Sequence, residues 1–221
     1  LARLPLAGAN TKMRFWLDLN WITWRLAIEQ AHLMYGFGDN SMRRKNLDFL
    51  LARVKHGDRV LDLGCKNGEI SAILAEKAGS VIAVDHDASA LDIARKNHGA
   101  KNLEFVHADA FDVLRRQSAP MDVVVLSHIL EHLEEPGDML VHLKKHVTHC
   151  YIELPDLDAT YLNHFRRLAD AKLQYTDNDH IWEFDRDSLR EVIESAGWRV
   201  LDSEYRYGVQ KHWCAHAGSP V

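Results

Sequence analysis

The sequence predicts an α/β fold: a doubly wound, mostly parallel seven-stranded sheet with an antiparallel C-terminal hairpin and an N-terminal helical extension. Three observations support this prediction. Short apolar runs alternate with helical patterns from Arg59 to His146, which is typical of a parallel sheet covered on both faces. Two strand-like runs separated by a glycine end the chain. An amphipathic helical pattern precedes the first strand.

Length and composition exclude several classes of protein. The chain has 221 residues, with 27 Lys and Arg against 32 Asp and Glu; this length predicts one domain, and without clustered basic residues we expect no nucleic-acid partner. No apolar run reaches the ~18 residues of a membrane span, so we expect no stable membrane insertion. The three cysteines lack a CxxC pair, which favours a reducing compartment and a cytoplasmic protein.

The N-terminal part divides into two segments. We expect residues 1–12 to be a leader or a vector-derived segment, with Met13 as the native start, because they show little periodicity. Residues 13–45 form an amphipathic helical extension with a wide apolar arc. We expect this arc to pack on the chain's own domain or on a second copy in a homodimer, to cover a substrate, or to contact a membrane surface. The arc consists of two stripes: Phe15, Leu19, Ile22, Leu26 and Leu33, and Leu17, Trp21, Trp24, Ile28, Ala31 and Tyr35.

The remaining elements belong to one domain, residues 46–216. We expect parallel strands in five apolar runs, at 59–63, 80–84, 103–106, 121–126 and 150–154. Helices are expected in the periodic segments between and after them, at 69–78, 88–98, 110–117, 137–146 and 187–196. The hairpin strands are 198–205 and 208–216. The polar and aromatic insert 155–183 lies over a strand end, where insertions commonly build substrate pockets.

The strongest local signal is the turn Val-Leu-Asp-Leu-Gly-Cys-Lys-Asn-Gly-Glu at residues 60–69. Gly64 allows a sharp turn, and Gly68 lets a ligand approach the backbone at a helix N-terminus. Asp85 ends the next strand, where a nucleoside ribose is held by its two hydroxyls. One strand further on, Asp109 lies within reach of an adenine amino group. Ligand is therefore expected outside the carboxyl ends of the strands.

These pieces, in this order, resemble class I (Rossmann-like) S-adenosylmethionine-dependent methyltransferases over roughly residues 47–198. Residues 123–133, 153–156 and 179–184 resemble segments of the small-molecule methyltransferase subfamily. The resemblance implies S-adenosylmethionine as the cofactor and S-adenosylhomocysteine as the product. It assigns cofactor-binding roles to residues at the expected edge: Asp62, Gly64, Cys65, Gly68, Asp85, His86, Asp109, Ala110 and Ser127.

Some residues leave alternatives open. Lys66 replaces a glycine of the family pattern, and we expect it to keep a negative φ and to point away from the ligand. Its ammonium group could also meet the carboxylate of the cofactor. Asp62 and Asp109 have structural interpretations, as a loop hydrogen-bond acceptor and a helix N-cap. A nicotinamide enzyme is less favoured, because its G-x-G-x-x-G signature is absent from the loop.

Methyl transfer to a hydroxyl requires alignment of donor and acceptor and removal of a proton. The candidate catalytic residues are His128, one residue beyond the fourth strand, and His180 in the insert. Their structural alternatives are a loop histidine and a surface histidine bonded to Asp179. We expect no metal ion, although Mg²⁺ is not excluded because the insert is rich in oxygen ligands. Such a set would comprise Asp156, Asp158, Asp179 and His180.

The sequence therefore predicts an S-adenosylmethionine-dependent methyltransferase that methylates a small molecule or a glycan sugar, with oxygen as the preferred acceptor atom. Similarity to the subfamily associates it with surface-polysaccharide or natural-product biosynthesis, which is an argument by analogy. The alternative is a catalytically silent methyltransferase fold that serves as a binding or scaffold subunit. Lys66 and the aromatic N-terminal helix would be its marks.

Overall fold

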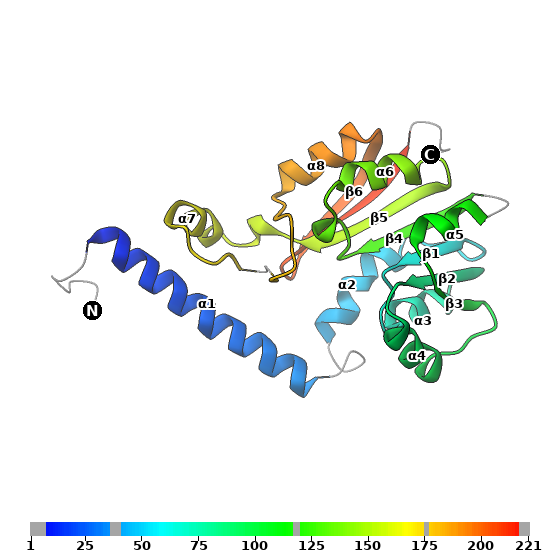
Figure 1. The fold of residues 1–221 in the computed structure, drawn as a ribbon, viewed down its shortest axis with the longest axis horizontal. Coiled ribbons are helices and arrows are strands. Elements are labelled where there is room, and N and C mark those ends of the chain that lie inside the picture. Colours follow the sequence, from blue (N-terminus) through cyan, green and yellow to red (C-terminus); the bar gives the residue numbers. More distant parts are fainter. Residues whose placement is uncertain (1–7, 36–40, 117–119, 175–176, 217–221) are drawn as a thin grey trace.

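A computed structural model describes residues 8–35, 41–116, 120–174 and 177–216. Its centre is a seven-stranded sheet in the order β3-β2-β1-β4-β5-β7-β6 (Figure 1). The first five strands pair in parallel, and β7 runs antiparallel to both β5 and β6. The predicted fold class is thus confirmed.

Each predicted strand is present. The strands are β1 Arg59–Leu63, β2 Ser80–Asp85, β3 Leu103–His107, β4 Met121–Ser127, β5 Val147–Pro155, β6 Trp198–Arg206 and β7 Val209–His216. In the parallel register Leu63 pairs with Val84 on one side and with Leu126 on the other. The carboxyl ends of β2, β1 and β4 therefore lie at one edge, where an open α/β sheet binds its ligands.

The helices follow the predicted order, with one more inside the insert, where none was predicted. They are α1 Ala9–Met34, α2 Ser41–Leu51, α3 Glu69–Ala75, α4 Ala88–Asn97, α5 Ala110–Arg116, α6 Pro136–Leu143, α7 Leu162–Ala169 and α8 Arg186–Ser195. Two short 3-10 turns are η1 Leu130–His132 and η2 Leu157–Ala159. Both α3 and α6 end earlier than predicted. Pro136 occupies the first turn of α6, where its missing N–H costs no intrahelical bond.

Apolar residues cover both faces of the sheet because successive strand residues point in opposite directions. Val60 and Val125 pack with α2 and α3 on one face, whereas Leu61 and Val124 pack with α5, α6 and α8 on the other. These layers close the faces and leave the edge at the strand ends for chemistry.

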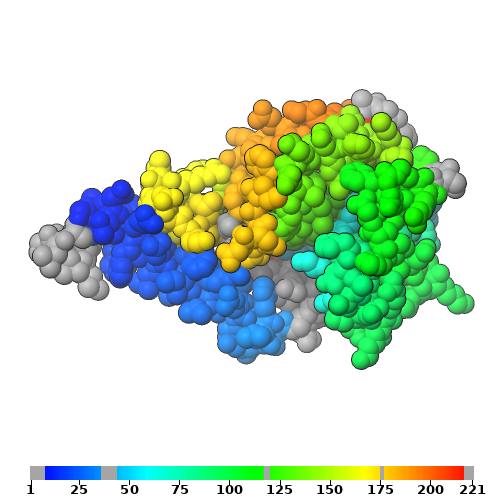
Figure 2. Space-filling view, in the orientation of Figure 1, coloured from blue at the N-terminus to red at the C-terminus, as the bar shows by residue number. Residues whose placement is uncertain are grey.

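Helix α1 extends from the domain as a long arm that lies along α7 (Figures 1 and 2). It begins at Ala9, so residues 9–12 belong to the helix rather than only to the segment before Met13. No helix among the described residues has the combined length and apolarity that a bilayer crossing requires. One predicted stripe is exposed over most of its length, at Phe15, Leu19, Ile22, Leu26 and Leu33.

The other stripe of α1 contacts the insert. Leu17 is buried, and Trp21 donates its indole N–H to the carbonyl oxygen of Leu173 at 3.0 Å. Arg166 on α7 donates to the carbonyl of Leu17 at 3.0 Å and to Oδ1 of Asn20 at 2.7 Å. A buried cation bonded to another element's backbone fixes the position of that element, because leaving the donors unpaired would be costly.

Candidate active site

The glycines of the β1–α3 loop are favoured by their backbone conformation and by close neighbours. Gly64 has φ +70°, and a Cβ there would lie 2.4 Å from Cδ1 of Ile129. Gly68 has φ +79°, and a Cβ there would meet the ring of Phe105 at 2.6 Å. A side chain at Gly68 would thus collide with Phe105, and the approach of a ligand to the Gly68 backbone stays a prediction. These positions also favour glycine because L side chains rarely adopt positive φ.

Lys66 corrects a prediction. Its φ is +47°, in the left-handed region, so the expectation of a negative φ is wrong. Its backbone N–H donates to Oδ2 of Asp85 at 2.7 Å, a charge-assisted bond that helps offset the strain of the left-handed conformation. The exposed Lys66 side chain contributes to the cavity wall described below.

Asp85 connects the glycine loop to the end of β2. It is 5% exposed, and its Oδ1 accepts the N–H of Asp87 at 2.8 Å while Oδ2 accepts that of Lys66. A carboxylate has about four lone-pair sites, so hydrogen-bonding capacity remains for ribose hydroxyls. His86, next along the chain, has a side chain 97% exposed to solvent.

Asp62 lies below the same loop, buried beside α3. Its Oδ2 accepts the hydroxyl hydrogen of Ser71 at 2.6 Å, which joins β1 to α3. Burial raises its pKa to about 7; the Ser71 bond opposes this increase and the charge of Asp85 adds to it. Burial and the charges of Asp62 and Asp85 also raise the pKa of Cys65 to about 12. The Cys65 thiol is therefore protonated at neutral pH and inert as a nucleophile.

Asp109 has the structural role that was left open for it. It is exposed at the start of α5, and its Oδ1 accepts the N–H groups of Phe111 at 2.9 Å and Asp112 at 3.4 Å. This is N-cap geometry. A contact of Asp109 or Ala110 with adenine stays a prediction, and a capping carboxylate can also accept a further hydrogen bond.

A cavity of about 450 Å³ lies at the edge of the sheet between the glycine loop and α1. The predicted site residues that line it are Asp62, Gly64, Cys65, Ser127, His128 and His180. Those outside its lining are Gly68, Asp85, His86, Asp109 and Ala110. Helix α1 supplies a wall through Trp24, Arg25, Ile28 and His32. Part of the apolar arc, at Trp24 and Ile28, therefore lies over the cavity, and a role of α1 as a lid over a substrate stays a prediction.

His128 is held over this cavity by two buried carboxylates. Its φ is +55°, and its N–H donates to the carbonyl of Glu153 at 2.8 Å. Its Nδ1 lies 3.1 Å from Oε1 of Glu131, and its Nε2 lies 3.8 Å from Oε1 of Glu153. Because an ionised carboxylate only accepts, Nδ1 carries the proton in the neutral ring and Nε2 keeps its lone pair.

The charges around His128 favour its protonated form. Burial lowers its pKa, and the Lys66 ammonium group lowers it as well. The hydrogen bond to Glu131 and the negative charges of Glu153 and Glu131 outweigh both effects, so the pKa of His128 lies above its ordinary value. The surroundings can therefore stabilise an imidazolium ion at this position.

His180 differs from its predicted structural alternative. Its side chain is 4% exposed, and its Nδ1 lies 3.1 Å from Oε1 of Glu183. Asp179 instead contacts His132, whose Nδ1 lies 3.2 Å from the Asp179 carbonyl oxygen. The interpretation of His180 as a surface histidine bonded to Asp179 is therefore wrong.

Sequence reasoning missed two carboxylates of this site. Glu131 had no predicted role in the site, although it stands three residues after His128 and contacts it. Glu153 pairs with Ser127 in the sheet register, and its carboxylate accepts the hydroxyl hydrogen of buried Tyr151. The signal available for Glu153 was its place at the end of the strand that leads into the insert.

The proposed Mg²⁺ ligands are not brought together. Asp156 pairs with Arg186 at 2.7 Å, and Asp158 lies 3.2 Å from Nε2 of His164. Among the described residues, His180 instead clusters with Glu131 and His132. Asp156 and Asp158 are thus occupied by contacts with α8 and α7.

Comparison with known proteins assigns the family. A family model described as "Methyltransferase domain" matches residues 37–203. The chain belongs to this methyltransferase family. The methyltransferase is 31% identical over 141 residues to the mitochondrial ubiquinone biosynthesis O-methyltransferase of Schizosaccharomyces pombe, covering 59% of the chain and 48% of the relative. It is 34% identical over 106 residues to the ubiquinone biosynthesis O-methyltransferase of Xylella fastidiosa (strain M23), covering 45% and 43%. The methyltransferase spans just under half the length of these curated relatives.

Solved structures of methyltransferases have the same fold as this chain. The structure of magnesium protoporphyrin IX methyltransferase from Synechocystis PCC 6803 with bound S-adenosylhomocysteine has a TM-score of 0.62 at 16% identity, and the match covers 94% of this chain and 99% of that one. A methyltransferase from Aquifex aeolicus described as S-adenosylmethionine-dependent gives 0.58 at 16% identity, with 94% and 98% covered. The methyltransferase has the class I fold, and S-adenosylmethionine is the cofactor of that class.

The residues present suit this cofactor. The cavity combines a carboxylate, Asp62, with an ammonium group, Lys66, which complement the amino and carboxylate groups of a methionine moiety. The buried Asp85 carboxylate stands at the adjoining strand end with acceptor capacity to spare. We therefore expect Asp62 and Lys66 to hold the methionine half and Asp85 the ribose.

Asp85→Ala is expected to weaken S-adenosylmethionine binding at least about 100-fold. The reason is the loss of two hydrogen bonds to a charged acceptor, each contributing roughly 1.5–3 kcal/mol. Isothermal titration calorimetry measures the change. Asp92→Ala is the matched control, because Asp92 is exposed on α4 and forms its ion pair with Arg95 on the same helix. Unchanged affinity in Asp85→Ala would remove the ribose assignment.

Proposed function

We propose that the chain transfers a methyl group from S-adenosylmethionine to a hydroxyl oxygen of a small molecule or a glycan sugar, in the cytoplasm, with His128 as the proton acceptor. One observation carries the proposal. The Nδ1 of His128 is engaged by buried Glu131, so its Nε2 is available beside the cavity that the glycine loop also lines. A base oriented by a carboxylate is a common arrangement for removing a hydroxyl proton.

The cofactor would supply an electrophilic methyl group on its sulfonium. The residues of the chain then have two tasks. Asp62, Lys66 and Asp85 hold and orient the donor at the sheet edge, and the walls from α1 align the acceptor, because displacement requires both in line. His128 accepts the acceptor's proton at Nε2, and Glu131 and Glu153 stabilise the imidazolium that results.

The cavity walls offer two kinds of acceptor contact. Trp24, Ile28 and Tyr207 supply apolar and aromatic surface for a ring, which favours a small aromatic hydroxyl compound. The names of the relatives from Schizosaccharomyces pombe and Xylella fastidiosa, which specify O-methyltransferases, support oxygen as the acceptor atom. Arg25, Asn46 and Asp177 supply hydrogen-bonding groups, which is the observation that favours a glycan sugar.

Acceptor screening tests the proposal. The purified chain is incubated with S-adenosylmethionine and catechols, phenols, oligosaccharides or thiols, and S-adenosylhomocysteine is quantified by mass spectrometry. We expect turnover with hydroxyl acceptors, aromatic ones first. Turnover with thiols alone would contradict oxygen as the acceptor atom. Cofactor binding without turnover, together with a stable protein partner, would favour the silent scaffold subunit.

A second copy of the chain is the partner that we propose for the exposed stripe of α1. The stripe carries Phe15, Leu19, Ile22, Leu26 and Leu33 along one side of the helix, and exposed apolar rows of this kind often mark interfaces. Light scattering of the wild-type chain and of Leu26→Glu would report the mass of each. Equal masses would exclude a dimer through this stripe.

A further inference from the structure

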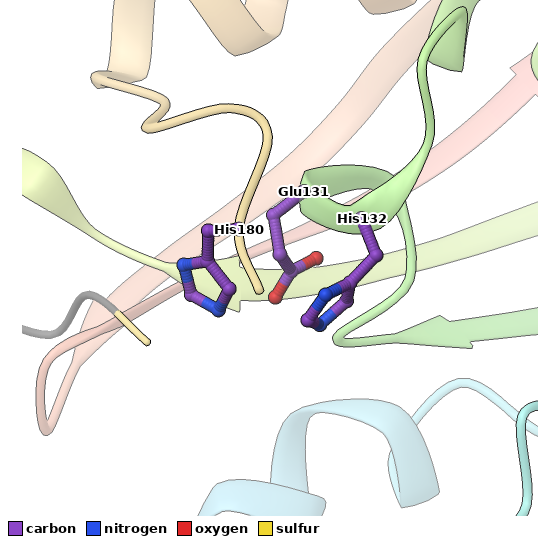
Figure 3. Close-up of side chains that lie close together, drawn as sticks. All are labelled: Glu131, His132 and His180. Carbon is purple, nitrogen blue, oxygen red and sulfur yellow. The ribbon is translucent and has the colours of Figure 1, made fainter. Parts of the chain in front are cut away.

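We propose that Glu131, His132 and His180 form a binding site for one divalent transition-metal ion of the Zn²⁺ type. One ligand atom from each residue lies within 4.8 Å of the other two (Figure 3). In Figure 3 the carboxylate of Glu131 lies between the two imidazole rings. The inference goes beyond the proposed methyl transfer and does not depend on it.

The fold brings two distant segments together at this point. Glu131 and His132 belong to η1 after β4, and His180 lies in the segment before α8. The N–H groups of Ile181 and Trp182 donate to the carbonyl of Glu131 at 2.8 Å and 3.1 Å. Backbone hydrogen bonds therefore hold together the two segments that carry these side chains without a metal, as a preorganised site requires.

Glu131 has a buried carboxylate oxygen that can serve as a metal ligand. The residue is 1% exposed, and its Oε1 accepts from Nδ1 of His128. Its Oε2 is buried and lacks a hydrogen-bond partner among the described residues. An unpaired buried carboxylate oxygen costs free energy, and such an atom in a native structure calls for an explanation such as a bound ion.

Hydrogen bonding leaves each of the two histidines one ring nitrogen with a free lone pair. Nδ1 of His132 bonds to the carbonyl of Asp179, and Nδ1 of His180 bonds to the Glu183 carboxylate. Both partners only accept hydrogen bonds, so each neutral ring is protonated at Nδ1 and has its lone pair on Nε2. This pattern, in which a carboxylate or carbonyl orients the ligating imidazole, is the usual support of a metal-bound histidine.

Two imidazole nitrogens and one carboxylate oxygen specify the class of ion. Zn²⁺ and related transition metals accept this donor set, whereas Mg²⁺ and Ca²⁺ prefer oxygen ligands throughout. Three protein ligands leave a fourth position for water. His180 also lines the cavity, so an ion here would fasten the segment around His180 to the turn that carries His128.

Metal titration of the full chain tests the site. After dialysis against a chelator and its removal, the wild-type chain is titrated by calorimetry with Zn²⁺ and separately with Mg²⁺. We expect one equivalent of Zn²⁺ to bind, Mg²⁺ to bind much more weakly, and bound Co²⁺ to give a visible absorption spectrum typical of tetrahedral or five-coordinate nitrogen and oxygen ligation. Absence of stoichiometric Zn²⁺ binding would overturn the proposal. The close approach of the three groups would then be explained by a proton that they share.

Substitutions of the three proposed ligands test where the ion binds. Glu131→Gln, His132→Ala and His180→Ala are each expected to lower Zn²⁺ affinity more than the ~10–100-fold loss typical when only a hydrogen-bond partner of a ligand is removed. Glu183→Ala, which removes such a partner of His180, is expected to fall within that range. His142→Ala is the matched control, because His142 also bonds through Nδ1 to a backbone carbonyl but is exposed on α6.

The folding of each variant is checked by circular dichroism before titration. The increase in Tm on adding Zn²⁺ is a second readout, because a ligand that binds only the native state stabilises it. We expect this increase in the wild type and in His142→Ala, and its loss in the ligand variants. Ligand variants that bind Zn²⁺ as tightly as the wild type would place the ion elsewhere and overturn the assignment.

Discussion

Replacement of His128 by asparagine is expected to lower kcat roughly 100- to 10,000-fold, the contribution typical of a positioned general base. Asparagine tolerates the left-handed backbone conformation of this residue, φ +55°, better than most side chains. It cannot accept a proton at neutral pH, so the variant separates the chemistry of the imidazole from the shape of the loop. Affinity for S-adenosylmethionine should change little, because the residues that we expect to hold the cofactor, Asp62, Lys66 and Asp85, lie on β1, the glycine loop and β2.

Two measurements check this prediction. Calorimetry gives the cofactor affinity, and initial rates with an acceptor found by screening give kcat and KM. His98→Asn is the control, because His98 ends α4, away from the residues that line the cavity. An unchanged kcat in His128→Asn would assign the proton transfer to another group. A loss of cofactor binding would show that His128 supports the loop rather than the reaction.

The sequence was sufficient for the features that depend on local pattern. Apolar strands followed by helices predicted the sheet, and parallel strands must place their carboxyl ends at one edge. Asp62, Ser127 and His128 were therefore correctly expected near one another, and the structure places all three on the cavity wall. The functional roles given to them remain proposals.

Features set by tertiary contacts escaped prediction. Glu131 and His180 are far apart in the chain, and tertiary hydrogen bonds bring them together, among them those from the backbone of Ile181 and Trp182 to the carbonyl of Glu131. Asp179 was the obvious sequence neighbour for His180, yet the structure gives that histidine Glu183 instead. Lys66 was judged by local sterics alone, whereas a hydrogen bond to Asp85 from another strand compensates its positive φ.

The N-terminal helix shows the same division between local and tertiary information. Its periodicity predicted an apolar arc wider than one interface needs. Which half of the arc is covered depends on the insert, where Arg166 and Leu173 bind one side of α1. The pattern of apolar residues carries no record of those partners, so the wall that Trp24 and Ile28 give to the cavity was one of several alternatives.

Asp62→Asn is expected to stabilise the fold above neutral pH. The folded pKa of Asp62 is about 7 against an ordinary value of 3.8, because burial disfavours the charge. A raised folded pKa means that the wild type loses stability as the pH rises from about 4 through about 7. At 1.36 kcal/mol per unit, the shift corresponds to about 4 kcal/mol at pH 8, as an order of magnitude. Asparagine has no charge to bury and can still accept the Ser71 hydroxyl hydrogen.

Urea unfolding followed by tryptophan fluorescence at pH 5 and pH 8 measures this difference. His212 titrates in the opposite sense, since burial lowers its pKa to about 4 and stability is lost as the pH falls from about 6.5 through that value. The comparison of Asp62→Asn with the wild type at each pH cancels this effect, and exposed Asp92→Asn is the control. A difference that stays constant with pH would contradict the raised pKa.

The same substitution should weaken S-adenosylmethionine binding, and the two effects have one cause. A carboxylate that is costly to ionise in the free protein gains most from a ligand ammonium group, because the positive charge then stabilises the ionised form. We infer that Asp62 lowers the free energy of unfolding above neutral pH and strengthens ligand binding, a trade-off that is common at functional sites. A variant that is more stable at pH 8 and also binds the cofactor as tightly as the wild type would show that Asp62 serves only to join β1 to α3.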